Sequence, residues 1–167
     1  EAGAEVTLAA RSAAPLEEAV AALTEAGFKA QSMVLDITDI EAVKAQLSAA
    51  EPFDIMVNSA GLARHSPALD TQPDDYDAVM GVNVRAAYFL SVAAAHGMKQ
   101  AGKGGSIINI SSQMAHVGGI DRAVYAASKH AVEGMTKSMA IEWGEHEIRI
   151  NTICPTFIKT PLTEQTF

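Results

Sequence analysis

Short runs of β-branched residues alternate along this chain with helix-length segments rich in alanine, and that order restricts the possible folds. The strand-like runs cover residues 5–10, 29–36, 53–58, 106–111 and 148–153. The helix-like segments cover residues 16–26, 40–49, about 71–100 and about 123–144. Strands that alternate with helices build a parallel sheet with crossover helices. We therefore predict an α/β fold with a doubly wound parallel sheet.

Helix boundary residues support this division of the chain. Pro15 suits an early helical position, and Gly27 tolerates the left-handed conformation that closes many helices. The segment Thr38-Asp-Ile-Glu41 has the pattern of a capping box, in which side chains bind the first free backbone N–H groups of a helix. These positions predict where the first two helices begin or end.

Length, composition and charge limit the class of protein. The 167 residues are 49% hydrophobic and 19% charged, which predicts one globular domain over residues 1–167. A net charge of −8 disfavours nucleic acid and anionic membranes as partners. Because neither a secretory leader nor a bilayer-length apolar segment is evident, we expect no membrane association and a cytoplasmic location.

The cysteine and histidine residues give no metal-binding pattern in the sequence. Cys154 is the single cysteine, and no zinc-type spacing of cysteine and histidine surrounds it. The five histidines form no His-Glu-x-x-His motif and no ligand-like pair. We therefore predict no metal site, and we expect Cys154 to be a small buried apolar side chain in a reducing compartment.

A serine, a tyrosine and a lysine form the most informative group. Tyr125 and Lys129 are four residues apart in a predicted helix, so they lie on the same helical face. A lysine ammonium close to a phenol favours the phenolate, which makes Tyr125 a candidate general acid and base. Ser112 follows a predicted strand at the edge where parallel sheets bind ligands, and its hydroxyl could hold a substrate carbonyl.

Together with two further segments, these residues resemble the classical short-chain dehydrogenase/reductase family over essentially the whole chain. Asn58-Ser-Ala-Gly61 resembles the Asn-Asn-Ala-Gly turn of the family, and Asn83 stands at the position of its helical asparagine. The resemblance implies that Tyr125 exchanges a proton with the substrate oxygen, that Ser112 binds this oxygen and that Lys129 assists the tyrosine and binds the nicotinamide ribose. It also implies that Asn83 holds a water in a proton relay.

The resemblance also implies a nicotinamide cofactor and its binding residues. Arg11 and Ser12 follow the first strand, where a cation and a hydroxyl suit the 2′-phosphate of NADP, with NAD as the alternative. Further cofactor contacts are expected at Asp36, Ile37, Asn58, Ala60, Gly61, Tyr125, Lys129, Pro155, Ile158 and Thr160. Thr156 replaces a glycine of the family pattern, so we expect backbone strain there if the family loop needs a positive φ.

Two family segments are missing from the sequence. The family opens with a strand and a glycine-rich turn that holds the pyrophosphate, and it continues beyond the position of Phe167. We therefore expect a partial Rossmann-like domain, incomplete at both ends, with open sheet edges and weak dinucleotide binding.

The resulting hypothesis is an oxidoreductase that transfers hydride between NADP(H) and a ketone or secondary alcohol on a small polar or acyl-chain substrate. The alternatives are an NAD(H)-dependent sugar or polyol dehydrogenase and a noncatalytic dinucleotide-binding scaffold of the same fold. Residues 82–95 and 126–143 are apolar on more than one helical face, so we also predict a homo-oligomer, either a dimer or a tetramer.

Overall fold

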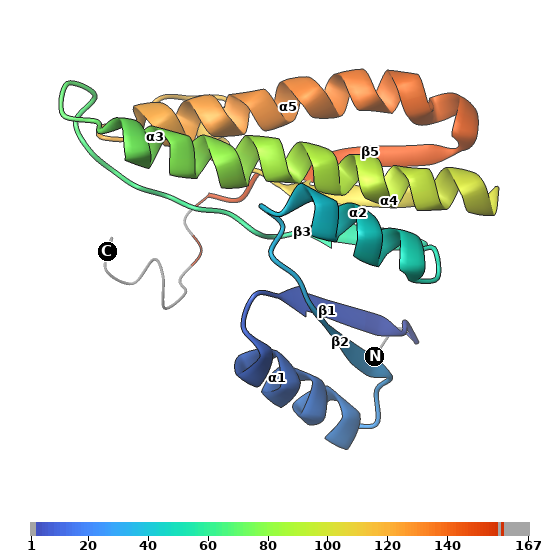
Figure 1. Ribbon diagram of the computed structural model, residues 1–167. Helices are drawn as coiled ribbons and strands as arrows, with labels where there is room; N and C mark the ends of the chain where they lie inside the picture. The colour runs from blue at the N-terminus through green and yellow to red at the C-terminus, as the bar shows by residue number, and fades with distance from the viewer. Residues whose placement is uncertain (1–2, 157, 159–167) are drawn as a thin grey trace.

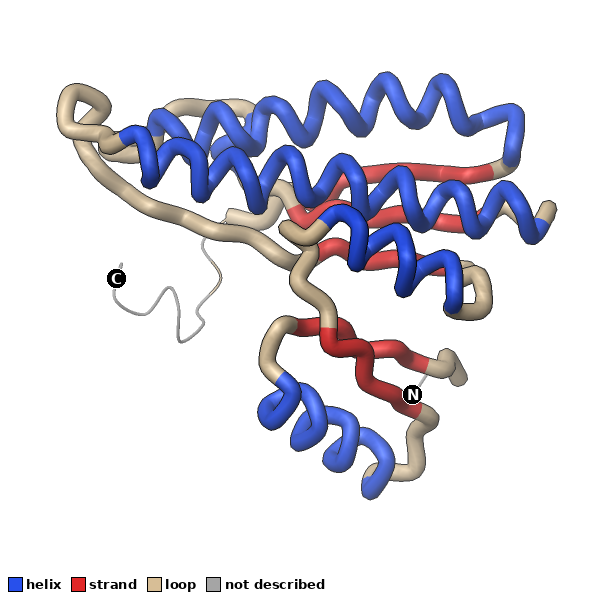
Figure 2. The backbone as a smooth tube through the Cα atoms, viewed as in Figure 1, coloured by secondary structure: helices blue, strands red, loops and turns tan. Residues whose placement is uncertain are grey.

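The computed structural model describes residues 3–156 and 158, and these residues form five strands and five α-helices. One helix connects each pair of successive strands except β3 and β4, which are connected by two (Figures 1 and 2). The strands are β1 Val6–Ala10, β2 Ala30–Val34, β3 Ile55–Asn58, β4 Gly105–Ile110 and β5 Ile148–Ile153. The α-helices are α1 Ala13–Glu25, α2 Ile40–Ala49, α3 Pro73–Met80, α4 Ala87–Ala101 and α5 Ala123–Trp143. A π-helical segment, η1 Gly81–Ala86, joins α3 to α4, and 3₁₀ turns lie at η2 Gln113–Ala115 and η3 Gly144–His146.

All strand pairs in the described residues are parallel, as expected for this fold class, but they form two sheets. β1 pairs with β2 from Val6–Ala30 to Ala10–Val34, and the second sheet has the order β3-β4-β5. Because the described part of β1 makes no ladder with β3, each sheet keeps an unpaired edge. Open sheet edges agree with the expectation from the sequence.

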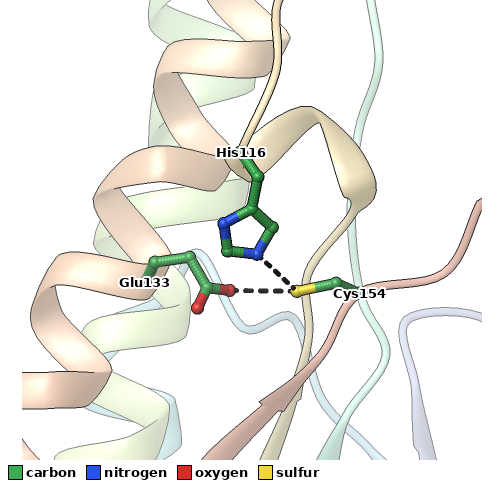
Figure 3. A group of neighbouring side chains, drawn as sticks. All are labelled: His116, Glu133 and Cys154. Carbon is green, nitrogen blue, oxygen red and sulfur yellow. Dashed lines mark hydrogen bonds between the residues drawn. The ribbon is translucent and has the colours of Figure 1, made fainter.

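The loops that follow β4 and β5 meet over the first half of α5. Gln113 N donates to Pro155 O at 3.0 Å, which joins the segment after β4 to the segment after β5. Beside this contact, Cys154 lies against Glu133 of α5 and His116 of the β4–α5 loop (Figure 3). The carboxyl ends of these two strands and α5 therefore form one packed region.

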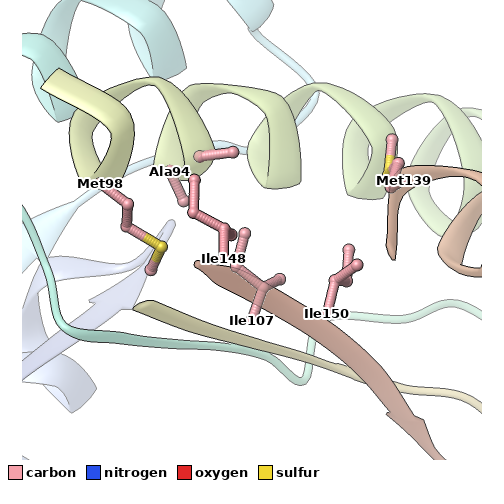
Figure 4. Packing of buried hydrophobic residues seen from close by; sticks show 7 residues of the cluster. Ala94, Met98, Ile107, Met139, Ile148 and Ile150 are labelled. Carbon is pink, nitrogen blue, oxygen red and sulfur yellow. The ribbon is translucent and has the colours of Figure 1, made fainter. Parts of the chain in front are cut away.

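The main core lies between the three-stranded sheet and the helices α4 and α5. Ile107, Ile148 and Ile150 point from the sheet toward Met98 and Met139 of the helices, and all five are at most 4% exposed (Figure 4). Burying side chains of this size contributes about 1.5–3 kcal/mol each. This packing holds α5 on the sheet and so fixes the position of Tyr125 and Lys129.

A second, smaller core connects the end of β2 to the larger unit. Leu35, Val43 and Leu90 are buried together, with Ile37 and Met56 packed against them. The cluster joins the chain after β2 to α2, α4 and β3. The two-stranded sheet is thus attached to the rest of the fold by apolar packing.

The helical run Pro73–Ala101 has the length and hydropathy of a membrane span, with a mean hydropathy of 1.4 in its most apolar window, of which 44% is buried in the fold. Six residues of α4 are buried, among them Leu90, Ala94 and Met98, and they pack on the sheet and on α2. This burial is characteristic of the core helix of a soluble protein.

Local sequence explains several element boundaries. The Asp39 side chain accepts from Ala42 N at 3.0 Å and caps α2, whose bounds agree with the predicted 40–49. Gly104 has a φ of 66°, and a Cβ there would lie 2.5 Å from Glu147 O, so only glycine fits this turn.

The non-glycine residues with positive φ in the described part are Asp121 and Glu147. Thr156 therefore lacks the strain that we considered for it.

Candidate active site

Tyr125 and Lys129 lie together near the beginning of α5, as their spacing predicts. Lys129 Nζ is 5.7 Å from the centroid of the Tyr125 ring and donates to Ile110 O, at the end of β4, at 2.9 Å. Lys129 is only 5% exposed, and its burial lowers the pKa of the ammonium, while the nearby charge of Cys154 acts in the opposite direction. A positive charge is thus held beside the phenol ring.

Asn83 is a buried clamp between the β3 turn and α5. Its Oδ1 accepts from Leu62 N at 2.7 Å, and its Nδ2 donates to Leu62 O at 2.8 Å and to Ser128 Oγ at 3.0 Å. Asn83 lies in the π-helical segment η1, and such segments are frequent at functional sites. Both side-chain donors of Asn83 are therefore used in holding protein groups, which is a structural role beside the relay implied by the resemblance.

Gly61 lies at the meeting point of these groups. A Cβ at Gly61 would lie 3.7 Å from Asn83 Oδ1 and 3.8 Å from Lys129 Nζ. The turn after β3, the helix segment η1 and α5 therefore converge on one small region, with Tyr125 next to it.

A chain of buried amides fixes the turn that begins at Asn58. Asn58 Nδ2 donates to Asn109 Oδ1 at 3.1 Å, and Asn109 Nδ2 donates to Ser91 Oγ at 3.4 Å. Asn58 Oδ1 accepts from Ala60 N at 3.3 Å, which closes the turn locally. Because Asn109 is on β4, this chain holds the β3 turn in register with the strand that ends beside Ser112.

Ser112 lies two residues after the end of β4, one residue further from the strand than the sequence predicted. Its Oγ accepts from Met114 N at 3.2 Å and caps the turn η2. The hydroxyl proton remains available for a further acceptor, because this contact uses an oxygen lone pair. Ser112 is half-buried, on the segment that Pro155 holds in place.

His65 and Arg122 border Tyr125 on its other side. The His65 and Tyr125 rings are in edge contact at 5.9 Å between centroids, and Arg122 Nη1 donates to His65 Nε2 at 2.7 Å. Partial burial and the positive charge of Arg122 lower the pKa of His65. His65 is therefore neutral near pH 7, with its proton on Nδ1. The Arg122 guanidinium lies on the far side of His65 from the Tyr125 ring.

A second group of predicted site residues lies at the carboxyl ends of β1 and β2. Arg11 and Ser12 follow β1 and are exposed, and Asp36 follows β2. Hydrogen bonds from the backbone and side chain of Thr38 lower the pKa of Asp36, with a smaller contribution from the charge of Arg11. Ile37 packs against the second core. Of the expected contacts after β5, Ile158 is exposed, and Thr160 lies outside the described residues.

Comparison with known proteins identifies the family of the chain. The family model of the short chain dehydrogenases matches residues 1–167. The chain is 38% identical to gluconate 5-dehydrogenase of Gluconobacter oxydans over 98% of its own length and 65% of that protein. The chain belongs to the short-chain dehydrogenase family.

Two further members of the family show the range of relatives. L-xylulose reductase of Bos taurus is 36% identical over 79% of this chain and 54% of that protein. The crystal structure of a gluconate 5-dehydrogenase from Burkholderia cenocepacia, in complex with NADP and tartrate, superposes with a TM-score of 0.93 at 31% identity. That match covers 98% of this chain and 65% of the solved one, so the present sequence spans about two thirds or less of these dehydrogenases.

The structure adds residues that sequence analysis missed. Asn109, Ser128 and His65 contact residues of the predicted site, and Arg122 contacts His65. Ser128 lies between Tyr125 and Lys129 but was given no role, and the other three belong to no motif that we used. Asn109 is a polar residue inside the run 106–111, which we predicted only as a strand. A polar residue in the middle of an apolar strand was the available indication, since buried polar groups need partners.

Proposed function

We propose that the protein is an NADP(H)-dependent oxidoreductase that interconverts a ketone and a secondary alcohol on a sugar acid or ketose. The observation that carries the proposal is the buried ammonium of Lys129, 5.7 Å from the ring of Tyr125 and fixed by Ile110 O. We infer from this proximity that Tyr125 is the group that donates and accepts the proton, with Lys129 as the cation beside it.

In the proposed reaction, the protein positions the substrate oxygen and moves a proton to or from it. Ser112 donates a hydrogen bond to the oxygen, Tyr125 Oη gives or takes the proton, and Lys129 balances the charge on the phenolate. Asn83 keeps the β3 turn against α5, so that Gly61 and Lys129 border the same space. The bound nicotinamide supplies or accepts the hydride.

The residues present fit NADP at the adenosine end of the site. Within the described part of the chain, neither the Arg11 guanidinium nor the Ser12 hydroxyl is engaged in a hydrogen bond, and both are exposed at the end of β1. A cation beside a hydroxyl suits a phosphate ester. Arg11 and Ser12 would hold the 2′-phosphate, and Asp36 and Ile37 would border the adenine.

Asn58, Ala60, Gly61, Pro155, Ile158 and Thr160 are proposed as contacts along the remainder of the cofactor. NADP is also present in the solved Burkholderia cenocepacia relative. NAD remains the alternative cofactor.

The choice of a sugar acid or ketose rests on the surroundings of Tyr125 and on the relatives. Arg122 donates to His65, whose ring is in edge contact with the ring of Tyr125, so one side chain separates a cation from the phenol ring. A guanidinium suits the carboxylate of a sugar acid. The relatives include gluconate 5-dehydrogenases, whose name favours a sugar acid as the substrate. They also include an L-xylulose reductase, whose name favours a neutral ketose as the second candidate.

The test is turnover of the purified protein with NADP⁺ and NADPH on a panel of sugar acids, their keto forms and neutral ketoses. Tyr125→Phe removes only the hydroxyl, and we expect kcat to fall by at least about 100-fold, the usual minimum for loss of a general acid. Tyr88→Phe is the matched control, because Tyr88 is an exposed tyrosine on α4, and its kcat should be unchanged.

Two results would contradict the proposal. Equal kcat for Tyr125→Phe and the unaltered protein would exclude Tyr125 as the proton donor. NADP(H) binding without turnover of any panel member would favour the noncatalytic scaffold.

A further inference from the structure

His116, Glu133 and Cys154 form a compact cluster of side chains outside the group proposed for catalysis (Figure 3). The three come from different parts of the fold: His116 from the β4–α5 loop, Glu133 from α5 and Cys154 from the segment after β5. Cys154 Sγ is 3.4 Å from His116 Nε2 and donates to Glu133 Oε1 at 3.3 Å. One ligand atom from each residue lies within 4.8 Å of the other two.

These distances match those between the ligands of a tetrahedral metal ion. Bond lengths of about 2.3 Å for Zn–S and about 2.0 Å for Zn–N and Zn–O place tetrahedral ligand atoms about 3.3–3.6 Å apart. The two separations from Sγ, 3.4 and 3.3 Å, agree with this range. All three ligand atoms lie within 4.8 Å of one another, so an ion between them would need adjustment mainly of the His116–Glu133 pair.

The donor set and its support also suit a transition metal. Thiolate, imidazole and carboxylate are the three protein ligand types of zinc. Glu133 Oε2 accepts from Thr152 Oγ1 at 3.0 Å, and this bond orients the carboxylate with Oε1 toward the sulfur, as outer hydrogen bonds do around metal sites. His116 is exposed, so an ion can enter from solvent and water can complete the coordination.

We propose that His116 Nε2, Glu133 Oε1 and Cys154 Sγ bind a divalent transition metal ion of the Zn²⁺ type, with water as the fourth ligand. Binding replaces the thiol proton by the metal, and the proton passes to solvent. The ion would fasten the loop after β4, the segment after β5 and α5 to one another. His116 is four residues after Ser112, and Glu133 is four residues after Lys129, so the clamp would support segments that carry the proposed catalytic group.

Cobalt spectroscopy tests the proposal directly, because Cys154 is the only cysteine in the sequence. Co²⁺ is added to tag-free, metal-free protein under a phosphine reductant, without cofactor. We expect one equivalent to give a near-ultraviolet thiolate-to-cobalt charge-transfer band together with visible bands of tetrahedral intensity. Zn²⁺ should displace the Co²⁺ and abolish both sets of bands.

Variants assign the ligands. Cys154→Ser should remove the charge-transfer band, and His116→Ala and Glu133→Gln should each weaken Co²⁺ and Zn²⁺ binding at least about tenfold, since even outer-shell changes cost 10–100-fold. His146→Ala is the matched control, because His146 pairs with Glu145 at 3.5 Å but has no cysteine beside it, and its metal affinity should be unchanged.

A melting experiment compares each variant with itself, with and without Zn²⁺, so a difference in stability between variants does not affect the result. Zn²⁺ should raise the Tm of the unaltered protein and of His146→Ala, and it should leave the Tm of Cys154→Ser unchanged. The proposal is overturned if no cobalt–thiolate band forms, or if His116→Ala and Glu133→Gln bind both ions as tightly as the unaltered protein. Neither result would bear on hydride transfer, since these measurements contain neither cofactor nor substrate.

Discussion

Lys129 carries a positive charge into a nearly water-free position, and this has a cost in stability. The unfolded chain keeps the lysine proton up to the ordinary pKa of 10.5, whereas burial lowers the pKa in the folded protein. Between the two values the unfolded state binds more protons, so the folded state becomes more stable as the pH rises through this window. At neutral pH the buried ammonium is therefore a destabilising feature that the proposed chemistry requires.

Lys129→Met tests this statement. We expect the variant to lose turnover, and we expect its free energy of unfolding, relative to the unaltered protein, to decrease as the pH is raised from neutral toward 10.5. Denaturant unfolding at several pH values measures the difference. Lys137→Met, an exposed position on the same helix, should give a difference that does not change with pH. A pH-independent difference for Lys129→Met would mean that the pKa of Lys129 is not lowered.

Arg11 is the residue on which the proposed preference for NADP rests. Arg11→Ala would remove the proposed charge-assisted hydrogen bond to the 2′-phosphate, so NADP binding should weaken about 10- to 100-fold, while NAD binding should change little. Dissociation constants for both cofactors measure this. Arg149→Ala, an exposed arginine on β5, is the control. Equal losses for NADP and NAD would exclude the phosphate contact.

Secondary-structure elements were the part of the fold that sequence patterns predicted best. The bounds of α2 and β5 agree with the predicted ranges 40–49 and 148–153, because a capping residue marks the first and a run rich in isoleucine marks the second. The π-helical segment η1 was not predicted, because one extra residue per turn leaves almost no trace in an apolar helix pattern. The cluster of His116, Glu133 and Cys154 was missed because its members are 17 and 21 positions apart.

Asn83 joins three elements, and its removal should disturb all of them. Asn83→Ala leaves Leu62 N, Leu62 O and Ser128 Oγ without their buried partner, so we expect a loss of about 1–3 kcal/mol in the free energy of unfolding, together with reduced turnover. Urea unfolding measures the stability. Asn151→Ala, at an exposed position on β5, should change it little. An unchanged stability for Asn83→Ala would contradict the clamp.

At the scale of the whole molecule, the outer surface of α4 and α5 remains the place where we predict a second subunit. Ile141 is 84% exposed and Tyr88 is 42% exposed, although both lie on helices whose other faces are buried. Exposed apolar side chains on packed helices favour an interface between subunits. No partner chain is needed to form the group around Tyr125.

Analytical ultracentrifugation tests the prediction of an oligomer. The protein should sediment as a dimer or tetramer, and Ile141→Glu together with Tyr88→Glu should shift it toward the monomer. Ile120→Glu, at a loop position that is 90% exposed, is the control and should leave the oligomer intact. A monomer at high concentration would exclude the association.

All the strands run in the same direction, and this divides the molecule into two halves with separate tasks. The side chains that we propose for catalysis gather at the carboxyl ends of β3 and β4, whereas the opposite ends hold tight turns such as the one at Gly104, which reverses the chain. Exchange of the loops at the carboxyl ends of the strands should therefore alter which ligand is bound, while the turns at the amino ends keep the strands in place. Affinity tags or fluorescent labels are best attached near residues 26–29 or 50–53, far along the strand axis from Tyr125.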